Sequence, residues 1–332
     1  MTKYELMLIS MSLSATIIAF VLFIIRRTGP NRLGHTVLYY LWLPVLLRSL
    51  LPFSFDSTLL NRIFRDYYAA ATYFVKPMEF GEEGRKVIIG SNVHAPALQN
   101  PNPFTVWIIL WLLVAVALLI KKITSYYAFS KYIRAGWQPV DTPKILDALG
   151  DACEKMKIRQ TVNLCVNPLI STPLLLGVTK PVIVLPAVPD NPEILECTLT
   201  HELVHCKRQD VLYIWLTQLV LCVHWFNPVF YAIHRQTARD RELSCDEQVI
   251  KNRSEADRIT YGRTLLETFA GKGTYQERNV TTALLENKSL LRERLEAIDS
   301  FTYLPAASFR LTVILILLVA LCLIVGIYTP AG

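Results

Sequence analysis

Apolar runs long enough to cross a lipid bilayer constrain this chain more than any other feature. A helix that spans the hydrocarbon core needs about 20 apolar residues. Four segments meet this requirement: residues 6–25, 36–55, 103–120 and 311–328. The second contains Pro44 and Arg48, whereas the other three carry no charged residue. We therefore predict an integral membrane protein with four transmembrane helices, the last of them within residues 310–332.

The composition agrees with a membrane protein and argues against other classes. Hydrophobic residues make up 52% of the chain and charged residues only 18%, against about 25% charged residues in a typical soluble protein. The formal net charge is +7. However, no stretch of Lys and Arg interleaved with aromatic residues is present, and such a stretch is typical of nucleic-acid contacts. We therefore expect a lipid bilayer as the environment and no direct nucleic-acid binding.

Basic residues beside the predicted spans indicate their orientation, because cytoplasmic loops carry an excess of Lys and Arg. Arg26 and Arg27 follow the first span, Lys121 and Lys122 follow the third, and Arg310 precedes the fourth. If all of them are cytoplasmic, both termini lie outside. This predicts three spans in residues 1–122 with an extracellular loop at 56–102, followed by a cytoplasmic domain at 123–309.

The cytoplasmic segment predicts a mixed α+β domain. Residues 162–186 contain short apolar runs separated by prolines, a pattern typical of a small sheet with an open edge. Asn191-Pro192-Glu193 then reads as a helix start, since a capping side chain precedes a proline and an acid. Residues 211–226 carry no formal charge but are short for a full span. They form either a buried helix or one that dips into the membrane, and we favour the second.

The helix that begins at Asn191 contains the motif His201-Glu202-Leu203-Val204-His205. Two histidines four residues apart lie on one face of a helix, where both imidazoles can bind the same zinc ion. Glu202 lies beside the first of them and can take a proton from a zinc-bound water. The motif therefore predicts a zinc hydrolase with Glu202 as the catalytic base.

A catalytic zinc needs a third protein ligand. The best candidate is Glu242, because Asp246 follows on the same helical face and could hold the free nitrogen of a ligand histidine. Other residues that could compete for this place are His224, His234, Cys206 and Cys245. We expect His224 to have a core or interfacial role, and we expect the two cysteines to point away from the site.

These motifs, in this order, resemble the BlaR/MecR-type β-lactam sensor-transducers, a family of integral-membrane zinc metallopeptidases. The resemblance rests on Ser171-Thr172-Pro173, Gly177, residues 181–186, the histidine motif through Asp210, Trp225-Phe226-Asn227-Pro228 and Glu242-Leu243-Ser244-Cys245-Asp246. It implies a gluzincin-like fold, with one zinc ion on His201, His205 and Glu242. It also implies that the substrate adds as a strand to a sheet edge formed by Leu174, Leu175, Leu176, Val182, Ile183 and Val184.

The resemblance also implies a role in signalling. In that family, an extracellular antibiotic or cell-wall signal leads to cleavage of a cytoplasmic transcriptional repressor, and the peptidase also cuts itself. The matching stretch here gives Ala283–Leu284 as the self-cleavage bond. We expect a multi-pass protein of a bacterial-type plasma membrane that forms a homodimer. No Ser-x-x-Lys or Lys-Thr-Gly motif occurs in the chain, so we expect the C-terminal penicillin-binding sensor domain to be absent.

Two other functions remain open from the sequence. Membrane-protein quality-control metallopeptidases also combine a His-Glu-x-x-His motif with a later Glu-x-x-x-Asp, but they resemble a plan with full spans between the two. Here 36 residues separate His205 from Glu242. The other alternative is a signalling scaffold with a structural zinc, although such a site has no need of Glu202.

Overall fold

The computed structural model describes residues 3–28, 33–51, 103–269, 288–302, 313–314 and 317–318 of the chain. Two described helices, α1 (Lys3–Thr28) and α5 (Pro103–Ala135), are long and apolar enough to cross a membrane. They contain the predicted first and third spans. Only 6% of the most apolar window of α5 is buried, and an apolar surface of that size suits a lipid environment.

The predicted second span forms helix α3 (His35–Leu50), which is shorter than the 36–55 segment that we expected. Leu51 is extended, with φ −106° and ψ 120°. The next residue is Pro52, whose ring disfavours helical backbone at the preceding residue. The sequence prediction was therefore wrong about where this helix ends. The loop 56–102 lies outside the described residues, as does all of the fourth span except residues 313–314 and 317–318.

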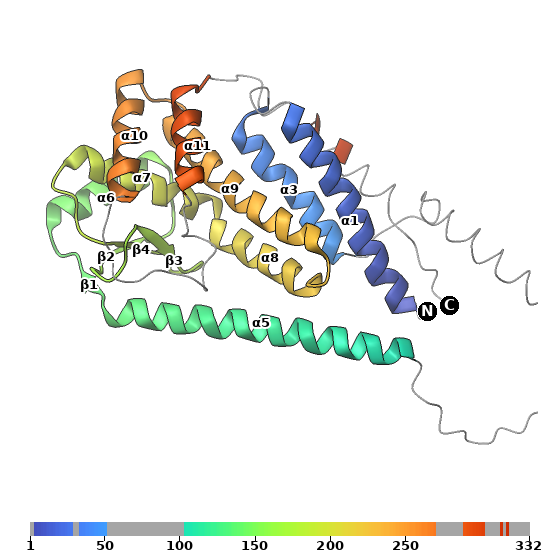
Figure 1. Cartoon of the computed structure of the whole chain (residues 1–332). Coiled ribbons are helices and arrows are strands. Elements are labelled where there is room, and N and C mark those ends of the chain that lie inside the picture. The colour runs from blue at the N-terminus through green and yellow to red at the C-terminus, as the bar shows by residue number, and fades with distance from the viewer. Residues whose placement is uncertain are drawn as a thin grey trace, which may run out of the picture.

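Helices α1, α3, α8 (Asp210–Val223) and α9 (Pro228–Ile250) run side by side in one bundle, as Figure 1 shows. Apolar side chains from all four helices form a shared core. This core includes Ile18, Trp42, Val45, Val220, Phe230 and Ile233. Helix α9, which carries Glu242 and Asp246, is therefore packed directly against α1 and α3.

The turn between α8 and α9 is anchored by hydrogen bonds to α1, α3 and α5. Asn227 Nδ2 donates to Ser12 Oγ at 2.9 Å. His224 Nε2 lies 2.9 Å from the carbonyl oxygen of Ser49, near the end of α3. Trp111 Nε1 donates to the carbonyl oxygen of Val223 at 2.8 Å. The α8–α9 turn thus lies beside the C-terminal end of α3.

A four-stranded sheet lies beside this bundle in the order β1-β2-β4-β3. The strands are β1 (Gln138–Pro139), β2 (Asn163–Val166), β3 (Leu174–Leu176) and β4 (Val182–Leu185). Strand β4 pairs with β2 in parallel and with β3 in antiparallel orientation. Of the residues expected at a sheet edge, only Leu174, Leu175 and Leu176 belong to an edge strand. Val182, Ile183 and Val184 lie in an interior strand because β2 pairs with β4 across 15 intervening residues.

Helices cover both faces of the sheet. Phe129 and Ile133 of α5 pack on one face, and α6 (Pro143–Lys155) and α7 (Pro192–Arg208) pack on the other. The predicted start of α7 is confirmed, because the Asn191 side chain accepts a hydrogen bond from the backbone N–H of Glu193 at 2.9 Å. Helix α7 ends at Arg208, and the next residue, Gln209, has a left-handed φ of 56°. This break turns the chain directly into α8.

Two further helices complete the described structure. Helices α10 (Glu255–Phe269) and α11 (Lys288–Asp299) lie beside α7 and α9 in Figure 1. Tyr261, Leu265 and Leu291 pack against Val204 and Cys245 in a common core. Residues of α10 and α11 therefore reach the helices that carry the motifs.

Candidate metal centre

Two helices bring three potential ligand atoms together. On α7, the Nε2 atoms of His201 and His205 are 3.2 Å apart. Each of them lies 3.7 Å from Glu242 Oε2 on α9. Zinc–nitrogen bonds of 2.0–2.1 Å in tetrahedral geometry place neighbouring ligand atoms about 3.3–3.4 Å apart. The two imidazoles and the carboxylate therefore have the donor chemistry and the spacing that fit one zinc ion.

The other ring nitrogen of each histidine has a hydrogen-bond partner. His205 Nδ1 lies 2.6 Å from Asp210 Oδ2, and His201 Nδ1 lies 2.8 Å from the Tyr261 hydroxyl. Since that hydroxyl donates to Asp246 Oδ1 at 2.6 Å, it accepts from the Nδ1–H of His201. Both contacts favour the tautomer that leaves the Nε2 lone pair free for a metal. Asp246 reaches His201 through Tyr261 rather than directly, its own oxygen being 3.6 Å from Nδ1.

Buried charges surround the carboxylates of the site. Arg294 of α11 donates to Asp246 from Nε at 2.6 Å and from Nη2 at 2.7 Å. Arg241 Nη2 donates to Glu242 Oε1 at 3.0 Å. Burial alone would raise the pKa of Glu242, but Arg241 and the two histidines hold that pKa well below its ordinary value. Glu242 is thus kept in the ionised form that a metal requires.

Glu202 is buried next to His201, with 7% of its surface exposed. Burial raises the pKa of Glu202, and the neighbouring histidines oppose this shift only in part. A carboxyl group whose pKa is raised is better matched to taking up and releasing a proton near neutral pH. The environment of Glu202 is therefore suited to general acid–base chemistry.

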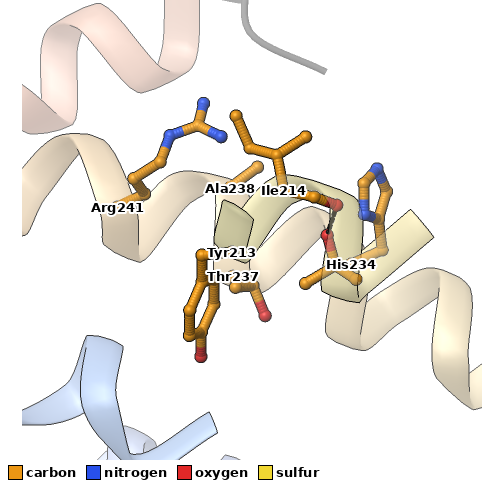
Figure 2. Close-up of a pocket in the computed structure, with 7 residues that line it drawn as sticks. Tyr213, Ile214, His234, Thr237, Ala238 and Arg241 are labelled. Carbon is orange, nitrogen blue, oxygen red and sulfur yellow. Dashed lines mark hydrogen bonds between the residues drawn. The ribbon is translucent and has the colours of Figure 1, made fainter. Parts of the chain in front are cut away.

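Three of the four competing ligands lie elsewhere. His224 stacks on Phe230 with ring centroids 4.3 Å apart, and Cys206 accepts a hydrogen bond from Gln160. His234 lines a small cavity between α8 and α9 together with Tyr213, Thr237 and Arg241, as Figure 2 shows. None of these three residues contacts Glu242 in the described part of the chain.

Cys245 differs from our expectation. It does not point away from the site, because α9 turns this side chain toward α7 and places its Sγ 3.4 Å from His201 Nδ1. The ligand atoms that His201, His205 and Cys245 offer lie within 4.8 Å of one another. We favour Glu242 over Cys245 as the third ligand because both Nε2 atoms converge on the Glu242 carboxylate. Cys245, in contrast, contacts the Nδ1 side of His201.

The sequence analysis missed Asp210, Tyr261 and Arg294 as parts of this site. Asp210 had a signal in the sequence, since it lies five residues after His205 and belongs to the stretch on which the family resemblance rests. Burial raises its pKa, but the hydrogen bond from His205 and the charge of Arg208 lower it to about 2. Tyr261 and Arg294 are 56 and 89 residues beyond His205, and only tertiary packing brings them near. The predicted self-cleavage bond Ala283–Leu284 lies outside the described residues.

Comparison with known proteins adds a family relationship. The family model described as BlaR1 peptidase M56 matches residues 6–298. The chain is 31% identical over 159 residues to the regulatory protein BlaR1 of Bacillus licheniformis, covering 47% of this chain and 26% of that protein. It is 23% identical over 301 residues to the methicillin resistance mecR1 protein of Staphylococcus aureus, covering 86% of this chain and 50% of that protein. The chain thus spans half or less of the length of these relatives.

Proposed function

Because the chain belongs to the BlaR1 peptidase M56 family, we propose that it is a membrane zinc endopeptidase whose zinc is held by His201, His205 and Glu242. The resemblance to BlaR/MecR-type proteins is confirmed by the same match. One observation carries the proposal for the site: two imidazole nitrogens and a carboxylate oxygen lie within 3.7 Å of one another. Glu202 is buried on the same helix as both histidines.

The chemistry follows from the residues around this centre. Zinc bound there would polarise a water molecule and the scissile carbonyl group. Glu202 takes a proton from the attacking water and gives it to the leaving amine. Asp210 and Tyr261 hold the imidazoles in the orientation and tautomer that metal binding needs.

The substrate is proposed to bind as an added strand along β3. This strand is the edge of the sheet next to β4, and it contacts α7, the helix with both histidines. An extended peptide can satisfy the open backbone groups of such an edge. Leu174, Leu175 and Leu176 would then line the peptide, whereas β4 supports them from the interior of the sheet.

The physiological substrate is proposed to be a cytoplasmic transcriptional repressor, with the chain's own Ala283–Leu284 bond as a second target. Relatives that carry the words regulatory protein and methicillin resistance in their names support a signalling role. We further propose that an extracellular antibiotic or cell-wall signal activates the peptidase, and that the active form is a homodimer.

Removal of the metal tests the zinc proposal. Dialysis of the purified full chain against a strong chelator is expected to abolish cleavage of the chain itself. Without the metal, no Lewis acid polarises the scissile carbonyl group or activates the attacking water. Readdition of one equivalent of zinc should restore the activity, measured as fragments by intact mass. If cleavage continues undiminished in the metal-free protein, the zinc peptidase proposal is wrong.

We also propose that α8 and the first part of α9 dip into the bilayer from the cytoplasmic side, with both chain termini outside. The α8–α9 turn forms hydrogen bonds to Ser12 and Ser49, which lie inside the predicted spans, and this supports the placement.

Cysteine labelling tests this placement. In a variant whose native cysteines have been replaced, Leu219→Cys on α8 should resist a water-soluble maleimide. Leu146→Cys on α6 is the matched control, since the exposed fractions of the two leucines are 37% and 42%. Equal labelling of both would contradict the dip.

A further inference from the structure

A hydrogen-bonded path connects α3, the predicted second span, to the candidate metal centre through only one intervening side chain. The Tyr39 hydroxyl donates to Asp210 Oδ1 at 2.9 Å. The other oxygen of the same carboxylate, Oδ2, lies 2.6 Å from His205 Nδ1. Tyr39 is 1% exposed and Asp210 is 2% exposed, so water does not compete for these bonds.

Arg208 fixes the middle of this path. Its guanidinium group donates to Asp210 and to Ser244 Oγ of α9, the latter at 2.8 Å. The same group lies over the Tyr39 ring, 4.8 Å from the ring centroid. Since Arg208 is the last residue of α7 and Asp210 the first of α8, the helix break at Gln209 places both side chains between α3 and His205.

The Asp210 carboxylate therefore has its two oxygens assigned to different helices. One oxygen accepts a hydrogen bond from the Tyr39 hydroxyl of α3, and the other accepts one from His205 Nδ1 of α7. A shift of α3 along its axis would move the Tyr39 hydroxyl, and the carboxylate would have to follow it or lose the bond. Partners of this kind behind a ligand histidine determine the ring orientation and the metal affinity.

We propose that Tyr39 is a positioning residue of the metal centre, which acts through Asp210 on the ligand His205 and so couples α3 to the peptidase site. The proposal rests on the zinc peptidase function proposed above. It means that a displacement of α3, the predicted second span, would act directly on the orientation of a metal ligand. Signals that displace α3 would thereby alter zinc geometry without any movement of the cytoplasmic sheet.

The test measures zinc affinity of the full chain in detergent by competition with a chromophoric chelator. Asp210→Asn should weaken zinc binding about 10- to 100-fold, the usual cost of losing such a partner. Tyr39→Phe should weaken it about 2- to 10-fold, the range that a net hydrogen bond contributes. The Co²⁺-substituted proteins should show altered visible absorption in the same order, because the ligand field changes with the orientation of His205.

Tyr213→Phe is the matched control. Tyr213 packs on the Tyr39 ring with centroids 4.7 Å apart, and its hydroxyl donates to the backbone of Tyr39 rather than to Asp210. Zinc affinity in this variant should stay within about 2-fold of the wild type, since no bond on the path is lost. In the Asp210→Asn background, Tyr39→Phe should have no additional effect.

The proposal is overturned if Tyr39→Phe binds zinc like the wild type, if Tyr213→Phe weakens binding equally, or if the effects of Tyr39→Phe and Asp210→Asn add up. Should Tyr39→Phe fail to fold, Asp210→Glu replaces it, because a longer carboxylate cannot hold both partners in place. Unchanged zinc affinity in Asp210→Glu would then overturn the proposal. Glu202→Gln separates the two claims: if that variant still cleaves, the peptidase mechanism is wrong, whereas the zinc affinities still decide the role of Tyr39.

Discussion

Glu202→Gln is expected to abolish peptide-bond cleavage and to leave zinc binding intact. The amide has the same size as the carboxylate but cannot take the proton of the attacking water, and loss of a general base costs about 10²- to 10⁴-fold in rate. Glu202 supplies none of the three converging ligand atoms, so the metal should stay. Wild type and variant are compared in isolated membranes by gel, intact mass and zinc content.

The matched control for this experiment is Glu196→Gln on the same helix. Glu196 has 55% of its side chain exposed and pairs only with the exposed Lys155 among the described contacts. This variant should cleave at the wild-type rate. Fragments of equal amount in wild type and Glu202→Gln would contradict the role of Glu202.

Arg294→Ala is expected to destabilise the protein by about 3–5 kcal/mol, the cost of leaving a buried carboxylate without its cation. Arg294 and Asp246 have side chains 4% and 2% exposed, and they share two hydrogen bonds. Among the described residues, the substitution removes both bonds and leaves the Tyr261 hydroxyl as the remaining hydrogen-bond donor to Asp246. Chemical unfolding of the full chain in detergent measures the change in free energy.

Arg292→Ala is the control for this prediction. Arg292 lies two residues earlier on α11 and pairs with Glu296, and both side chains are mostly exposed, at 83% and 63%. An exposed pair of this kind contributes at most about 1 kcal/mol. Equal destabilisation by the two substitutions would mean that the Arg294–Asp246 pair has no special weight in the fold.

Features that depend on near neighbours in the chain could be predicted from the sequence. The spacing of His201 and His205 specified a shared helical face, and Asn191 specified the start of α7. Both depend on side chains only a few residues apart, where helix geometry determines the outcome. The first and third candidate spans could also be predicted from the sequence, because length and hydropathy alone identify them.

Features that depend on tertiary packing could not be predicted in the same way. The edge position of Val182, Ile183 and Val184 was wrong because strand order does not follow chain order. The predicted direction of the Cys245 side chain was wrong because the rotation of α9 relative to α7 depends on a core that both helices share with α10 and α11. Tyr39 was not considered for the metal centre at all, since its partner Asp210 lies 171 residues away in the chain.

Zinc-edge X-ray absorption of the zinc-loaded full chain tests the central claim most directly, because it measures which atoms surround the metal. The account predicts one zinc ion per chain with nitrogen and oxygen neighbours at about 2.0–2.2 Å and two imidazole ligands. It also predicts no sulfur neighbour. A zinc–sulfur distance of about 2.3 Å would instead assign the third position to Cys245, and the absence of bound zinc would contradict the metal centre altogether.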